Sequence, residues 1–192
     1  MNLEREQIDP EDEVKVLLAQ GDEGAAASVV IRRYGPRALR YLRRMLVDKD
    51  DVADALSQWS ERVWHGLPAF EFRSSLRTWC ARLAANVGLN FRDEAWRRRV
   101  RRFESGEASA LAQSTHSSSE NRRRKLSELK EELDGKERTL FFLRVEEELP
   151  WAEIADILTS SGDPVDPGAA QKRFERMKDK LRLLARRKRL LD

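Results

Sequence analysis

Polar and basic side chains near the C-terminus recur at a helical spacing suited to reading duplex DNA. In residues 169–184, Phe174, Met177 and Leu181 define the face that is buried. That phase turns the intervening polar residues outward. An amide can pair with adenine, a guanidinium with guanine and a carboxylate with cytosine, while other cations meet phosphates. The candidate DNA-reading residues are Gln171, Lys172, Arg173, Glu175 and Arg176.

A second helix must lie before this one for the pair to act as a helix-turn-helix. Residues 151–158 have helical periodicity, and Asp166 followed by Pro167 is a good signal for the start of the second helix. The intervening turn, residues 159–167, is longer than the three or four residues usual for this motif. It could splay the two helices or form a small extra loop. An ordinary amphipathic helix with a solvated outer face remains an alternative.

A second basic block lies far upstream of the first. Residues 71–102 hold nine basic and three acidic residues, and residues 171–192 hold ten and three. Acidic stretches lie next to both blocks. Residues 1–24 hold eight acidic and two basic residues, and residues 128–166 hold twelve acidic and four basic residues. Such segregation indicates local docking of a polyanion at two places. Solvated helix faces with mixed charge would give a similar pattern.

The spacing of apolar residues predicts an all-α protein of two small domains. Helices are expected over residues 12–20 and 23–33, and Pro36 can start a third segment. Asp50 or Asp51 can cap a fourth helix. A long helix should follow, with Leu76, Trp79, Cys80, Leu83 and Val87 on its inner face. Residues 104–120 contain six serines and show no periodic spacing of apolar residues, so we expect a flexible tether there. The predicted division is 1–103, a flexible linker 104–125, and 126–192.

Composition argues against several classes of protein. No stretch approaches 18 apolar residues, so we expect no membrane span. The acidic start of the chain does not resemble a secretory signal, and the single Cys80 suits a reducing cytoplasm. The two histidines, His65 and His116, and the lone cysteine make no metal-ligand pattern. With neither a Gly-rich phosphate loop nor a nucleophile elbow, we expect no enzyme, no cofactor and no metal.

The order of these segments resembles bacterial RNA polymerase sigma factors of the extracytoplasmic-function class. Residues 21–46 resemble the opening of sigma region 2. Residues 51–64, which begin Asp-Val-Ala-Asp and end Arg-Val-Trp, resemble the segment that docks on the polymerase clamp. Residues 72–86, from Phe-Arg-Ser-Ser-Leu-Arg-Thr-Trp to Ala-Ala-Asn, resemble the promoter-melting segment. Residues 151–158 and 168–177 resemble the helix-turn-helix of region 4.

The resemblance implies a protein that makes no bond and instead holds polymerase on a promoter. The C-terminal residues named above would read the −35 element as duplex. A loop with Phe70 and Phe72 is placed like the loop that captures a flipped base, and Asn86 matches the family's asparagine. For the melted −10 element the residues are Phe72, Arg77, Arg82, Asn86, Arg92 and Arg97. For core polymerase they are Asp51, Asp54, Gln58, Glu61 and Arg62.

The implied partners are core RNA polymerase, through the clamp of its largest subunit and its flap, and promoter DNA in duplex and single-stranded form. An anti-sigma factor could also bind. Two other functions fit the helices. A stand-alone helix-turn-helix regulator would bind a palindromic duplex site without polymerase. A helical adaptor or anti-sigma-like protein would never contact DNA, so reversing the charge of Lys172 and Arg176 would leave its function intact.

Overall fold

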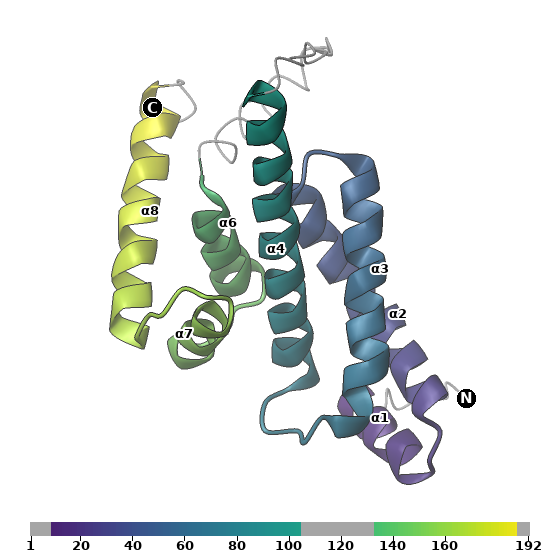
Figure 1. The fold of residues 1–192 in the computed structure, drawn as a ribbon. Coiled ribbons are helices and arrows are strands. Elements are labelled where there is room, and N and C mark those ends of the chain that lie inside the picture. Colours follow the sequence, from purple (N-terminus) through teal and green to yellow (C-terminus); the bar gives the residue numbers. More distant parts are fainter. Residues whose placement is uncertain (1–8, 105–132, 188–192) are drawn as a thin grey trace, which may run out of the picture. The chain divides into compact units, whose positions relative to one another are not determined.

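The computed structural model describes residues 9–104 and 133–187, and in that part of the chain every regular element is helical (Figure 1). The predicted all-α class is confirmed. Contacts divide the chain into Met1–Gly88 and Leu89–Asp192, a division that falls within one long helix. The predicted linker 104–125 lies almost wholly outside the described residues, so the predicted domain boundaries stay a prediction. No helix among the described residues is long and apolar enough to cross a membrane.

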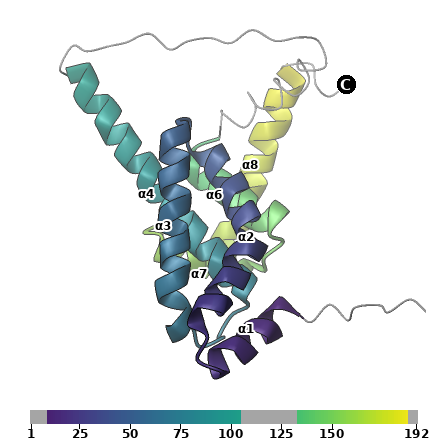
Figure 2. The same ribbon diagram turned by 90° about the vertical axis from the view of Figure 1, so that its right-hand side faces the viewer.

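The first unit begins with three helices joined by short turns. α1 spans Pro10–Ala19, α2 Glu23–Met45 and α3 Lys49–Gly66, and Figure 2 shows α1 lying across the end at which α2 begins. Gly21, at a φ of 77°, ends α1 in a Schellman turn: its N–H donates to the Leu18 carbonyl, and that of Asp22 to Leu17. The Asp22 carboxylate then caps α2 by accepting from Ala25 N–H.

Two predicted helix boundaries in this unit are wrong. Pro36 starts no new segment but lies inside α2, which continues through it. A proline there removes one helical hydrogen bond, and burial of Tyr41 and Leu42 just beyond it keeps the helix intact. Neither Asp50 nor Asp51 caps α3; Asp48 does, because its carboxylate accepts from Asp50 N–H at 2.8 Å.

Trp59 is the centre of the first unit's core. The short helix η1 (Leu67–Ala69) follows α3, and a loop then leads to α4 (Leu76–Glu104). The Trp59 side chain is 0% exposed, and its indole N–H donates to the Cys80 carbonyl of α4 at 3.1 Å. Gly88 allows α4 to approach α2 closely, since a Cβ there would lie 2.8 Å from the ring of Tyr41. These contacts join α2 and α3 to the first half of α4.

Besides the end of α4, the second unit contains three α-helices in its described part. α6 spans Gly135–Phe141 and opens with a capping box between Asp134 and Glu137. It continues as the π-helix η2 (Phe142–Glu146). α7 (Trp151–Ser160) and α8 (Pro167–Arg187) follow. Their buried side chains form the core: Leu140, Phe142, Leu143, Ile154, Ile157, Leu158, Phe174 and Met177.

Candidate nucleic-acid interface

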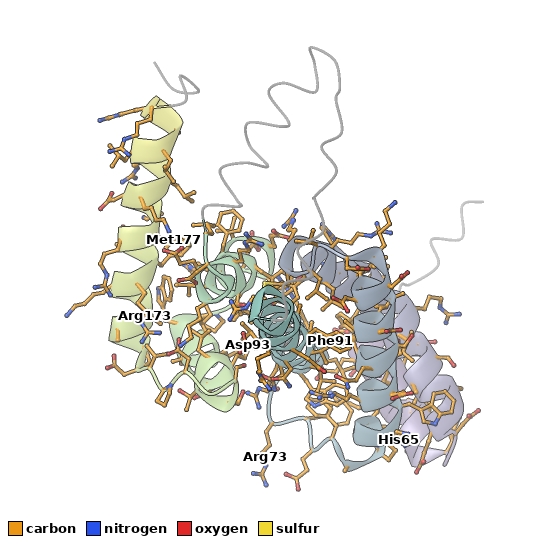
Figure 3. The ribbon with its side chains drawn as sticks, turned by 45° about the horizontal axis from the view of Figure 1, so that its top comes forward. His65, Arg73, Phe91, Asp93, Arg173 and Met177 are labelled. Carbon is orange, nitrogen blue, oxygen red and sulfur yellow. The ribbon has the colours of Figure 1, made fainter. Side chains whose placement is uncertain are left out.

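The predicted phase of α8 is confirmed. Phe174 and Met177 are buried, and Figure 3 shows Met177 on the side of α8 that faces α6 and α7. The remaining polar residues of the predicted DNA-reading set point to solvent, with one exception discussed below. Those exposed are Gln171, Lys172, Glu175 and Arg176. A rigid, solvent-facing helix with an amide, a carboxylate and two cations within two turns is what base-edge readout requires.

Arg173 differs from the other predicted readers because it is held by the turn between α7 and α8. Its guanidinium donates to the Asp163 carboxylate at 2.5 Å (Figure 3 labels Arg173 on α8). Lys136 of α6 reaches the other oxygen of the same carboxylate at 3.1 Å. Asp163 is 9% exposed, so one shielded carboxylate links three elements. Arg173 therefore braces the helix-turn-helix, and its predicted phosphate contact stays a prediction.

The long turn between α7 and α8 is closed by hydrogen bonds within its own residues. Gly162, at a φ of 83°, ends α7 in a Schellman turn, with Asp163 N–H donating to the Leu158 carbonyl at 3.0 Å. The Thr159 hydroxyl pairs with the backbone of Val165 across the turn. Asp166 then caps α8 by accepting from Ala169 N–H at 2.8 Å. The extra residues bring the bracing carboxylate into place between the helices.

We predict that Asp163→Ala destabilises the second unit by about 1–3 kcal/mol, the usual cost of losing hydrogen bonds to charged groups. The low part of that range is expected because Arg173 and Lys136 are partly exposed. Urea denaturation followed by circular dichroism measures the change. Asp156→Ala on the exposed side of α7 is the matched control, expected within about 0.5 kcal/mol of wild type. Equal losses in the two variants would contradict the bracing role.

A second polar face lies along the first half of α4. At about 100° per residue, Trp79, Arg82, Asn86 and Asn90 share one side of the helix. The first three are half-buried and Asn90 is exposed. Within the described residues, Arg82 Nε is buried and has no hydrogen-bond acceptor. The face thus combines an aromatic ring, a cation and two amides, which is the set that unstacked bases and their phosphates need. Asn90 was not predicted, although its spacing from Asn86 could have indicated it.

The aromatic end of this face is built by the loop before α4. Phe70 lies between two rings, with centroids 4.8 Å from Phe72 and 4.9 Å from Trp79. Trp79 in turn lies against Gly66, where a Cβ would come within 3.1 Å of its ring. Trp79, predicted on the inner face of the long helix, is only half-buried, so it remains partly accessible to solvent. Phe72 adopts a φ of 53°, rare for a bulky residue.

The other predicted −10 residues are not gathered on this face. By helical geometry Arg77 lies on the opposite side of α4 from Asn86, and Arg92 lies about a third of a turn away from it. Arg92 donates to the neighbouring Asp93 carboxylate at 2.6 Å. Arg97 is exposed and falls on the same side as Asn86, three turns on. The structure therefore brings Phe72, Arg82 and Asn86 together and leaves Arg77 and Arg92 apart.

Helix α1 holds the loop from its other side, a contact that the sequence did not indicate. The Glu11 carboxylate accepts from the backbone N–H of Leu76, the first residue of α4, at 3.1 Å. Lys15, one turn further along α1, forms an ion pair with Glu11 at 3.3 Å and lies 5.1 Å from the centre of the Phe72 ring. A carboxylate at a helix N-terminus is favoured by the helix dipole. These interactions fix both the start of α4 and the Phe72 ring.

We predict that Glu11→Ala costs about 0.5–2 kcal/mol of unfolding free energy, as for the loss of a helix cap. Glu11→Gln keeps an oxygen that can accept from Leu76 N–H, so it should retain most of that stability. Glu13→Ala, on the exposed side of the same first turn, is the control and should be nearly neutral. Thermal denaturation compares the three variants. A Glu13→Ala loss as large as that of Glu11→Ala would mean that charge in the first turn, rather than the contact with α4, is responsible.

The predicted polymerase-contact residues lie along α3. Asp54 and Glu61 are exposed, and Asp51, Gln58 and Arg62 are half-buried. Arg62 donates to the Gln58 side-chain oxygen at 3.4 Å, so these two form one polar pair on the helix. The face is thus available for a partner. Among the described residues no group of histidine, cysteine and carboxylate side chains is placed to hold a metal, and Cys80 is buried.

Comparisons with known proteins identify a family model and a solved structure that are similar to this chain. Residues 30–102, from the middle of α2 through most of α4, match the family model of sigma-70 region 2. A solved structure of CnrH in complex with the cytosolic domain of CnrY has a similar fold, with a TM-score of 0.62 at 19% identity. The match covers 92% of this chain and 97% of CnrH. A search of curated protein sequences found no significant match. The predicted resemblance to sigma region 2 is confirmed over residues 30–102.

Proposed function

Because residues 30–102 carry sigma-70 region 2, we propose that this chain is a sigma factor that directs core RNA polymerase to promoters and stabilises their melted DNA. One observation carries the proposal. The row of Phe72, Phe70 and Trp79 continues into Arg82 and Asn86 on one face of α4, within the matched region. Solvent-accessible aromatic rings beside a cation and amides suit unstacked bases rather than a duplex.

For the melted −10 element, the Phe72 loop would receive an unstacked base. Removing a base from the stack costs a few kcal/mol, which the protein must offset. Stacking on an aromatic ring supplies about 1–3 kcal/mol per base. The ring of Phe72 is already fixed by Lys15 and by Phe70, so little conformational entropy is lost on binding. Arg82 would meet the backbone, and Asn86 a base edge.

For the −35 element, α8 would enter the major groove. Gln171, Glu175 and Arg176 would meet base edges, with each well-placed pair worth about 1–3 kcal/mol of discrimination. Lys172, and Arg173 if it leaves Asp163, would meet phosphates, which set the orientation of the helix without reading sequence. Two separate DNA contacts on one chain suit a promoter with two spaced elements.

Protein partners complete the proposal. Core polymerase would dock through its clamp on α3, at Asp51, Asp54, Gln58, Glu61 and Arg62. The flap would contact the second unit. The similar protein CnrH is bound to the cytosolic domain of CnrY, and on that ground of shared fold we include an anti-sigma partner for this chain. The chemistry of transcription would belong to the polymerase, so the chain itself would act without a cofactor.

Transcription from a library of genomic fragments tests the proposal. The purified chain and bacterial core polymerase are combined, and the RNA start sites are sequenced. We expect a set of starts that is absent with core polymerase alone and that shares two spaced upstream elements. If no fragment gives starts that depend on the chain, the proposal fails. Tight binding to a palindromic duplex without polymerase would instead support the stand-alone regulator.

A further inference from the structure

A row of arginines on α2 is used by none of the roles above. Residues 24–47 contain six arginines and no acidic residue. Arg32, Arg33, Arg40 and Arg43 are exposed. At about 100° per residue, these four fall within about 100° of the helix circumference, so they form one stripe. We call these four residues the α2 stripe. From Arg32 to Arg43 the stripe is about 17 Å long, at 1.5 Å per residue.

Within the part of the chain that the structure describes, the α2 stripe has no carboxylate partner. Within residues 9–104 and 133–187, none of its four guanidinium groups forms an ion pair. Many other cations of the chain do have a carboxylate partner, among them Lys15, Arg73, Lys136, Lys178, Lys180 and Arg182. Among the described residues, Lys172 and Arg176 of the predicted DNA-reading face also form no ion pair.

The four arginines of the α2 stripe repel one another, and this repulsion has an energetic cost. Arg44, half-buried beside the stripe, has its pKa lowered by burial and, to a smaller extent, by the charge of Arg40. Like charges on one helix face repel each other, and residues 24–47 contain no acid that could offset the repulsion within the helix. An external anion would relieve that repulsion.

We infer that the α2 stripe is a further nucleic-acid-binding surface that takes the phosphate backbone of duplex DNA without reading its sequence. A duplex presents about one negative charge per 1.7 Å of axis, or about ten over the length of the stripe, twice the density of a single strand. Guanidinium groups suit phosphates geometrically, because they donate in a planar fork. A flat row of cations with no aromatic ring among the four favours duplex backbone over unstacked bases. This inference requires neither promoter recognition nor polymerase.

Binding of the full chain to a fluorescein-labelled random-sequence duplex tests the inference. Fluorescence anisotropy gives the binding constant between about 50 and 200 mM KCl. Each phosphate contact contributes about 0.9 to the slope of log K against log salt. We expect the triple variant Arg32→Gln, Arg40→Gln, Arg43→Gln to lose about 2–3 from the magnitude of that slope. The triple Arg→Lys variant keeps the charges and should keep the slope.

A second triple variant separates the α2 stripe from net charge. Lys136→Gln, Lys178→Gln, Arg182→Gln removes the same number of cations, each of which is already paired with a carboxylate. It should lower the slope by less than about 1, because these charges have few counterions to release. The inference is overturned if both glutamine triples change the slope equally, or if the stripe triple leaves it unchanged and instead weakens binding to core polymerase. The proposed function is tested separately, by promoter-dependent transcription with the wild-type chain.

Discussion

Trp59→Ala is expected to lower the free energy of unfolding by about 3–5 kcal/mol, the range for truncating a large buried aromatic side chain. The Trp59 side chain is 0% exposed and joins α3 to α4 through its hydrogen bond to the Cys80 carbonyl. Its loss would leave a cavity between the helix proposed to dock polymerase and the helix proposed to hold melted DNA. Urea denaturation measures the stability. Promoter-dependent transcription should fall with it, because both surfaces depend on this junction.

Two variants show whether the position or the residue type matters. Trp59→Phe keeps most of the volume and loses the N–H donor, so a cost of about 1–2 kcal/mol is expected. Trp64→Ala on the same helix removes a ring that is 49% exposed and lies over Gly24. It should cost about 1 kcal/mol or less, since less apolar area leaves water. A Trp64→Ala cost equal to that of Trp59→Ala would show that the core is not centred where the structure places it.

Lys172→Ala combined with Arg176→Ala is expected to weaken promoter complexes by about 10- to 150-fold at constant salt. A lost arginine contact to a guanine edge accounts for about 1–3 kcal/mol, and the lysine adds a salt-dependent part. Both side chains are exposed, so α8 should stay folded. Titration of the holoenzyme against a promoter fragment gives the affinity. Replacing the −35 element should weaken the wild type strongly and the double variant hardly at all.

The matched control uses the same helix. Lys180→Ala with Arg182→Ala also removes two cations, but these pair with Glu137 and Asp179 respectively. Exposed ion pairs contribute about 0–1 kcal/mol each, so neither stability nor promoter affinity should change much. Equal loss of promoter affinity in the two double variants would mean that α8 supplies general charge and does not read the −35 element.

Features that depend on local spacing could be predicted from the sequence. The apolar period fixed the phase of α8, so the burial of Phe174 and Met177 and the exposure of Lys172 followed from it. The turn at Gly21 and the cap by Asp22 are likewise local, since each needs only the residues beside it. The propensity of proline predicts a helix boundary at Pro36, but the burial of residues beyond it outweighs that preference and α2 continues.

Contacts between distant segments could not be predicted in this way. Glu11 and Leu76 are far apart in sequence, and no spacing rule indicates that α1 holds the start of α4. The pairing of Arg173 with Asp163 is of the same kind, since charge alone does not show which acid a base will meet. The α2 stripe is different. The six arginines between residues 24 and 47 are visible in the sequence, but the structure is needed to show that four of them are exposed on one side of α2.

Permanganate probing of unpaired thymines tests the central claim most directly. A promoter obtained from the genomic selection is incubated with the chain and core polymerase together, and with each alone. We predict reactive thymines just upstream of the transcription start only when both proteins are present, and a marked loss of that reactivity for Phe72→Ala with duplex protection upstream retained. If the chain alone gives the full footprint, and adding core polymerase opens no DNA, the account is wrong.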